Sequence, residues 1–222
     1  MSIEDKLLEN INEKVDSNLL YYNLLCEDDK IRGNEFKFKN IYTVNNINSE
    51  DELYDIAEII ACDLISQENA YFCETWVNSF KLNDHSSYHC ISASKNNQLS
   101  SMLNTMIGMS VHHSPMMPSG FICSNYKFKK FLDEDIVSPG LKLCFKSNNM
   151  FNFGTYYNIP LFSTLSCGEH EILCLPDKPG YYYNSGISLE FSKAPTNHLL
   201  SVSTTTILQF ENLICGSYLI TV

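Results

Sequence analysis

Arginine is almost absent from this chain. Arg32 is the single arginine among 15 basic residues, and 26 acidic residues bring the formal net charge to −11. Proteins that bind nucleic acid directly usually present a basic stripe that includes arginine. Here the densest basic cluster, at residues 127–130, is followed closely by an acidic run at residues 133–135. We therefore expect no direct binding of nucleic acid.

Long apolar runs and familiar catalytic signatures are also missing. No apolar run reaches the roughly 18 residues that a membrane-spanning helix needs, and the acidic, amphipathic first residues do not resemble a secretory signal. The sequence contains no P-loop, no dinucleotide-binding fingerprint, no H-E-x-x-H pair and no G-x-S-x-G elbow. These gaps argue against a membrane protein and against the common nucleotide-binding and hydrolytic enzymes.

Cysteine is frequent, but its spacing is irregular. The number of cysteines is odd, no CxxC pair occurs, and several cysteines lie inside apolar runs. Buried, reduced thiols in a cytosolic protein are therefore expected, and a disulfide scaffold is not. The nine cysteines are Cys26, Cys62, Cys73, Cys90, Cys123, Cys144, Cys167, Cys174 and Cys215.

Two short clusters of histidine and cysteine are candidate metal sites. Structural zinc sites use tetrahedral ligands at short, paired spacings, and neither cluster has such a pair. We therefore predict no metal ligand, no catalytic residue and no cofactor. An intracellular α+β enzyme with a Cys or His site stays an alternative, because nine cysteines and six histidines always allow some pair. The two clusters are His85, His89 and Cys90, and Cys167, His170 and Cys174.

Residues 2–26 are predicted to form an amphipathic helix. Ser2 can cap its first turn, with Asp5 at the capping-box position. Its apolar side chains recur at nearly helical spacing and form a packing face, which can fold onto the chain's own domain. The stripe comprises Ile3, Leu7, Ile11, Val15, Leu19 and Tyr22.

An extended segment and a long helix are expected next. Residues 31–48 alternate apolar and polar side chains around Phe36 and Phe38, which is typical of a ribbon or hairpin. Ser49 and Glu52 then form a second capping box, with carboxylates at the positive end of a helix. The apolar pattern continues to about residue 78, which predicts a helix about 40 Å long.

The second half of the chain alternates strands and helices. A strand at residues 118–123 precedes a helix at 125–132, which Ser124 can cap and in which Phe128 and Phe131 share a face. Another helix is expected at residues 97–109. Further strands are expected at residues 141–145, after Gly154, at 171–175, at 187–191 and over 204–222. The fold class is therefore α+β.

This order resembles the core of the tailed-phage major capsid proteins of the Hong Kong 97-type fold, which encapsulin shell proteins also use. In that family a strand and a helix ending in leucine precede a Gly-x-Pro-apolar strand. Here residues 121–132 match the first pair, and residues 154–161 match the second with a few extra residues between Gly154 and Pro160. The resemblance covers roughly the last half of the chain.

The resemblance implies a Hong Kong 97-type fold with a long spine helix, an extended loop, and mixed and antiparallel sheets. Residues 1–30 would form an N-terminal helical arm, residues 31–48 the extended loop, and residues 49–222 the shell core with its spine helix at 49–78. Arm and loop side chains would then contact neighbouring subunits. The candidate assembly residues are Leu7, Ile11, Val15, Phe36, Phe38 and Ile41.

The implied function is structural and not enzymatic. Copies of the subunit would assemble as hexamers and pentamers into an icosahedral head, in the host cytoplasm, and would remain in the virion. Other virion proteins are further expected partners, whereas the DNA genome would be enclosed without specific contacts. A non-enzymatic phage or host interaction protein unrelated to shells is the remaining alternative.

Overall fold

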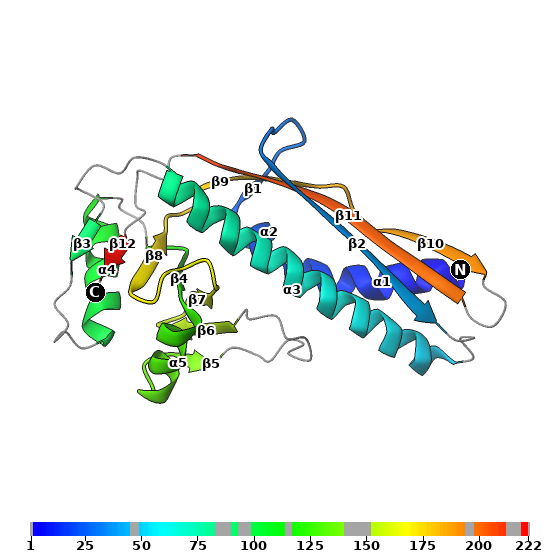
Figure 1. The fold of residues 1–222 in the computed structure, drawn as a ribbon, viewed down its shortest axis with the longest axis horizontal. Coiled ribbons are helices and arrows are strands. Elements are labelled where there is room, and N and C mark those ends of the chain that lie inside the picture. Colours follow the sequence, from blue (N-terminus) through cyan, green and yellow to red (C-terminus); the bar gives the residue numbers. More distant parts are fainter. Residues whose placement is uncertain are drawn as a thin grey trace.

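The computed structural model describes residues 2–44, 49–82, 90–92, 99–113, 117–139, 152–193, 198–211 and 219–221. The molecule is elongated and mixes helices with two sheets (Figure 1). At one end a long sheet lies along two helices, and we call this part the blade. A second sheet with two further helices forms the body at the other end. Among the described residues, no helix combines the length and apolar character needed to cross a bilayer.

The N-terminal helix starts as predicted but ends early. α1 spans Ile3–Asp16 and has the expected capping box: the Asp5 N–H donates to Ser2 Oγ over 3.1 Å, and the Ser2 N–H donates to the Asp5 carboxylate over 2.9 Å. The chain then breaks before a short helix, α2, at Leu20–Leu24. The prediction of one continuous helix over residues 2–26 is therefore wrong.

The break is held by Asn69, a buried side chain on the next long helix. Its Oδ1 accepts the N–H of Leu20 over 2.9 Å, and its Nδ2 donates to the carbonyl of Asn18 over 3.1 Å. Backbone groups that a continuous helix would have paired are thus satisfied by a side chain distant in sequence. A local sequence pattern carries no sign of this contact.

The spine helix is longer than predicted. α3 spans Glu50–Leu82, and its 33 residues correspond to about 50 Å at 1.5 Å per residue. The Glu52 N–H donates to Ser49 Oγ over 3.1 Å, which confirms the predicted start. One stripe of the helix is buried along its length, and it includes Leu53, Ala57, Ile60, Leu64, Phe72 and Trp76.

The blade sheet is built on two long antiparallel strands. β2 (Asn34–Val44) pairs with β11 (His198–Phe210) over its whole length. β10 (Ser188–Lys193) lies on the other side of β11, β9 (Gly180–Asn184) pairs with the last part of β11, and β1 (Cys26–Glu27) pairs with β9. Within the extended segment predicted at 31–48, residues 34–44 thus form a strand whose partner comes from the far end of the sequence, and residues 45–48 lie outside the described residues.

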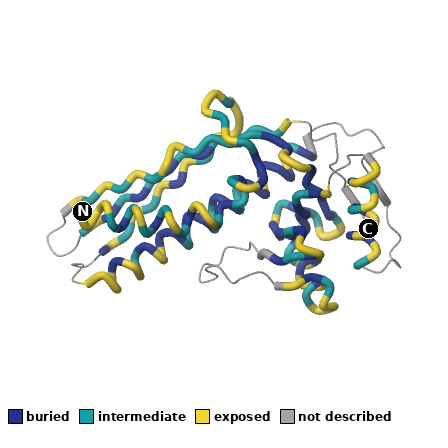
Figure 2. The backbone as a smooth tube through the Cα atoms, turned by 180° about the vertical axis from the view of Figure 1, so that it is seen from behind, coloured by how far each residue is buried: buried dark blue, intermediate teal, exposed yellow. Residues whose placement is uncertain are grey.

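The inner face of this sheet packs on α1 and α3. Phe38 and Val44 of β2 and Leu200 and Val202 of β11 are buried at alternate positions, as the two-residue period of a strand requires. Figure 2 shows buried residues along the inside of the blade and exposed residues on its outer sides. Tyr42 completes the contact, because its hydroxyl donates to the Asp63 carboxylate on α3 over 3.1 Å.

The body contains a mixed sheet that lies between two hydrophobic clusters. On β4 (Gly120–Cys123), Ile122 joins the cluster shared with the blade, whereas Phe121 and Cys123 join a second cluster covered by α4 (Leu99–His113) and α5 (Asn125–Asp133). In the described part of the chain the strand order is β3 (Cys90–Ser92), β12 (Leu219–Thr221), β8 (Glu171–Leu175), β4, β7 (Ile159–Ser163), β6 (Asn152–Tyr156) and β5 (Ser138–Pro139).

The body confirms most of the predicted elements. Ser124 caps α5, since its Oγ accepts the N–H of Lys127 over 3.2 Å. The extra residues between Gly154 and Pro160 form a tight hairpin between β6 and β7, and Tyr157 and Asn158 both have positive φ at its tip. α4 runs to His113, beyond the predicted end at residue 109. The strand predicted at 141–145 lies outside the described residues.

Replacing Ile11 by alanine tests whether α1 belongs to the chain's own core. Ile11 is fully buried, so the change removes apolar contacts and leaves a cavity, and we expect the free energy of unfolding to fall by about 2–5 kcal/mol. Chemical denaturation measures this loss. Ile3→Ala is the matched control on the same helix, because Ile3 is 52% exposed and its truncation should cost about 0.5 kcal/mol or less. Equally small effects would contradict the packing of α1 on α3.

Candidate functional site

The outer face of the blade sheet is the first candidate surface. Glu35, Lys37, Lys39, Ile41 and Thr43 occupy the odd-numbered positions of β2 and are all exposed. Lys37 and Glu35 form an ion pair of 3.2 Å on this face, and both side chains are largely in solvent. Such a pair contributes little to stability, so its charges stay available for contacts with another molecule.

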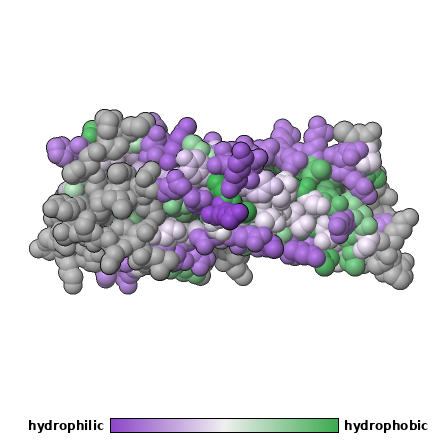
Figure 3. Space-filling model, turned by 90° about the horizontal axis from the view of Figure 1, so that it is seen from above, coloured by the Kyte–Doolittle hydropathy of each residue, from purple (hydrophilic) through white to green (hydrophobic). Residues whose placement is uncertain are grey.

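Apolar side chains interrupt this polar surface near the outer end of the blade. Ile41 is 60% exposed and Leu199 is 36% exposed. Ser201 lies opposite Ile41, and Leu199 lies opposite Thr43, so the two apolar side chains are diagonal neighbours across β2 and β11. Seen from above, hydrophobic side chains gather near this end, bordered by hydrophilic ones (Figure 3).

The spine helix exposes two further large apolar side chains. Tyr54 is 52% exposed and Ile59 is 58% exposed. The Lys14 ammonium lies 3.9 Å from the centre of the Tyr54 ring and joins α1 to α3 at the surface. Ile59 directly precedes the fully buried Ile60, and neighbouring residues on a helix do not share a face. The sequence signal that could have identified Ile59 is its position off the buried stripe.

A groove between the blade and the body offers another contact surface. It is lined by α3, by Phe36 and by the loop after β7, where Leu165 is 67% exposed. Phe36 stacks on Tyr71 with ring centres 4.8 Å apart, and the Tyr71 hydroxyl donates to the Asn34 carbonyl over 2.6 Å. The groove wall on the blade side is therefore held in place by contacts between β2 and α3.

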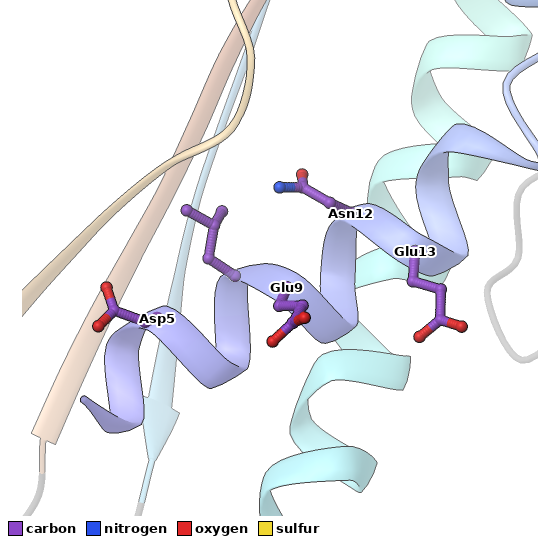
Figure 4. Close-up of a pocket in the computed structure, with 5 residues that line it drawn as sticks. Asp5, Glu9, Asn12 and Glu13 are labelled. Atoms are coloured by element: carbon purple, nitrogen blue, oxygen red, sulfur yellow. The ribbon is translucent and has the colours of Figure 1, made fainter. Parts of the chain in front are cut away.

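The acidic side of α1 has a shallow hollow. It is lined by Asp5, Leu8, Glu9, Asn12 and Glu13, and Glu9 and Glu13 project from the same side of the helix (Figure 4). The Asp5 carboxylate is occupied by the helix cap, and the hydrogen bond from the Ser2 N–H lowers its pKa. Carboxylates at helical spacing are typical of a solvated helix face.

The six predicted assembly residues fall into two groups. Ile41 lies on the outer face, and Phe36 is half-buried at the groove. The other four point into the chain's own core, so in this structure they present no surface to a neighbour. An apolar stripe predicts that a face is buried, but it does not say on which chain. These four are Leu7, Ile11, Val15 and Phe38.

The candidate metal ligands do not converge where the structure describes them. Cys167 and Cys174 are buried, and burial raises the pKa of the Cys174 thiol, whereas His170 is exposed. Across the described ranges, no group of three or more His, Cys, Asp or Glu side chains is arranged to hold a metal ion. His85 and His89 lie outside the described residues, as does the side chain of Cys90.

The cysteines only partly follow the prediction of reduced thiols. Cys62 on α3 is disulfide-bonded, which corrects the expectation for that residue. An irregular spacing of nine cysteines could not single it out, because pairing depends on which side chains the fold brings together. Cys26, Cys73, Cys123, Cys167 and Cys174 form no disulfide and are reduced, as expected.

Comparison with known proteins gives no match by sequence. Neither a protein-family model nor a curated protein sequence matches this chain. Solved structures do match it. The crystal structure of a virus-like particle from Pyrococcus furiosus is 14% identical, with a TM-score of 0.56 over 97% of this chain and 98% of that one.

Two further structures are similar along most of the chain. A phage-related protein from Bordetella bronchiseptica is 8% identical, with a TM-score of 0.57 over 98% of this chain and 96% of that one. The capsid structure of Staphylococcus phage Andhra is 9% identical, with a TM-score of 0.51 over 86% of this chain and 71% of that one. Identities this low establish the fold alone. With its spine helix, long blade strands and mixed body sheet, the chain adopts the Hong Kong 97-type fold that the sequence order predicted.

Proposed function

We propose that this protein is a structural shell subunit, which assembles with copies of itself into an icosahedral head around DNA. The observation that carries the proposal is the match over almost the whole length of both chains to a structure described as a virus-like particle. A protein of this kind acts by assembly, so the proposed function is not enzymatic. Its place is the virion, after assembly in the host cytoplasm.

The shape of the blade supports this function. A projecting layer of sheet and helices can reach a neighbouring subunit while its own apolar interior stays covered. The exposed Ile41, Tyr54, Ile59 and Leu199 then provide apolar surface for the contact. Full burial of one such side chain is worth about 1.5–3 kcal/mol, so a few repeated contacts can hold a shell together. Head-to-tail contacts of this kind close into rings when the rotation between copies allows it.

Each segment of the chain has its own role in the proposed shell subunit. Residues 31–48 and the spine helix, predicted at 49–78, supply the reach toward neighbours. Residues 1–30 brace the spine helix from within the same chain, and the rest of 49–222 forms the body. Hexamers and pentamers of such subunits, with other virion proteins as partners, would make up the head. Of the candidate assembly residues, Ile41 has the exposure that the role requires.

The charge of the chain is consistent with enclosing a genome without holding it. A net charge of −11 repels the phosphate backbone, so packaged DNA would not adhere to the shell wall. The genome would then be confined by the shell and not by sequence-specific contacts.

Electron microscopy of the expressed and purified protein tests the proposed function directly. We expect closed particles of uniform size, both inside expressing cells and after purification. The same material should sediment far faster than a single subunit of 25.4 kDa. A discrete monomer or dimer in both settings, at high protein concentration, would contradict the shell function.

Replacing Ile41 by aspartate tests the outer face of the blade. The change places a charge in a surface that a neighbour would have to desolvate, so we expect the yield of particles to fall at least tenfold, since about 1.4 kcal/mol per contact is already a factor of ten. The subunit should stay folded, because Ile41 is 60% exposed. Ser101→Asp adds the same charge to an exposed position on α4 in the body, away from this face, and is the matched control. Normal particle yield from the Ile41 variant, measured by size-exclusion chromatography, would rule out this face as a contact.

A further inference from the structure

Glu68 is a fully buried carboxyl group in the middle of the blade. It lies on α3, and its relative exposure is 0%. Tyr21 of α2 and Thr206 of β11, both also fully buried, face it, and Asn184 of β9 stands behind them. Four elements therefore meet around one ionisable group.

The hydrogen bonds around Glu68 form a closed cluster. Thr206 Oγ1 donates to Glu68 Oε1 over 3.0 Å, and Tyr21 Oη donates to Glu68 Oε2 over 3.4 Å. Tyr21 Oη and Thr206 Oγ1 are themselves 3.3 Å apart, where either atom can be the donor. Asn184 Nδ2 donates to both hydroxyl oxygens over 2.9 Å. Its Oδ1 accepts from Thr204 Oγ1 and the Gly186 N–H, which fixes the orientation of the amide.

This geometry accommodates both protonation states of Glu68, with different bonds in each. The carboxylate accepts both hydroxyl hydrogens, so no hydrogen is left for a bond between Tyr21 and Thr206. The neutral acid instead closes a ring: Glu68 donates to Tyr21, Tyr21 donates to Thr206, and Thr206 donates to the other oxygen of Glu68. In the ring every one of the three groups has a hydrogen-bond partner and no charge is buried. Burying the charged carboxylate costs more free energy.

The burial of the cluster also favours the neutral acid. Burial raises the pKa of Glu68 to about 7, although the hydrogen bonds from Thr206 and Tyr21 oppose this shift. The groups that act electrostatically on the adjoining Tyr22 and Tyr71 are acidic or phenolic. They come from α1, β1, β2, β9 and α3 itself, and they are Asp16, Glu27, Glu35, Tyr182, Glu68 and Glu74.

We propose that Glu68 is a proton-controlled joint that ties α2, α3, β9 and β11 together. Protonated, it closes the ring with Tyr21 and Thr206 and holds the N-terminal helices and the blade sheet to the spine helix. Ionised, it gives up the bond between Tyr21 and Thr206 and leaves a buried charge, so the joint weakens. The stability of the packing between these elements therefore changes with pH in the near-neutral range.

The sign of the pH dependence follows from the direction of the shift. The native state holds a proton on Glu68 up to about pH 7, whereas an ordinary glutamate loses it near 4.5. The stabilisation due to the neutral acid is complete below pH 4.5 and is lost as the pH rises through about 7. This is opposite to the usual carboxylate, whose native contacts are lost on acidification.

Infrared titration of the full-length protein tests the protonation directly. A carboxylic acid has a carbonyl stretching band that a carboxylate lacks. At about pH 6, where ordinary carboxyl groups are ionised, we expect one such band to remain in the wild type and to disappear with a midpoint near pH 7. Glu68→Gln should remove the band. Glu74→Gln, an exposed position on the same helix, should leave it unchanged. A wild-type spectrum without the band at about pH 6 would overturn the proposal.

Unfolding equilibria test the joint. Glutamine is permanently neutral and can replace the acid in the ring. The unfolding equilibrium constant of the wild type should therefore rise from about pH 5 to about pH 8 on the order of 50-fold more than that of Glu68→Gln. Glu74→Gln should behave like the wild type. Equal pH dependence in all three proteins would refute the joint.

A second variant covers the case in which Glu68→Gln does not fold. Tyr21→Phe keeps the ring volume but removes one donor from the carboxylate, so the midpoint of the infrared titration should move to higher pH. An unchanged midpoint would show that Tyr21 does not hold the carboxyl group.

The infrared test does not depend on the proposed shell function. The shell function matters for one further expectation only. If the protein forms shells, the particles should resist dissociation better at about pH 5 than at about pH 8. If the protein forms no particles, the proposed shell function is wrong. The role of Glu68 can still be tested in the single subunit.

Discussion

The burial of α3 between α1 and the pair of strands β2 and β11 is the contact on which the rest of the molecule depends. An isolated pair of strands is at best marginally stable in water, and most of the stability of a helix in a protein comes from packing one of its faces. Each element of the blade therefore needs the others. Once packed, they form a projecting layer with a covered apolar interior and few apolar side chains outside.

The body is joined to this layer through a single sheet with two covered faces. On β8, Leu173 and Leu175 join the cluster shared with the blade, whereas Ile172 and Cys174 join the cluster under α4 and α5. The two-residue period of a strand alternates these side chains between the clusters. The blade and the body are thus coupled through packed side chains on the two faces of this sheet.

Local signals in the sequence predicted where elements start, and they failed where distant residues meet. Ser2, Ser49 and Ser124 cap their helices as expected, because a cap needs only residues within one turn. The break after Asp16 depends on Asn69, and the partner of β2 lies near the end of the sequence. The prediction of the assembly residues was limited in the same way, because it also depends on contacts between distant residues. An apolar stripe at Leu7, Ile11 and Val15 is equally suited to a neighbour or to the chain's own spine helix, and tertiary packing decided for the latter.

For the proposed shell, amide hydrogen exchange on assembled and dissociated protein tests whether the blade is preformed within one subunit and offers only its outer side to copies. We expect α1 (residues 3–16) to be equally protected in both states and β2 (residues 34–44) to gain protection on assembly. Protection of residues 3–16 in the assembled state alone would contradict this expectation, because α1 would then owe its burial to a neighbouring subunit and not to α3.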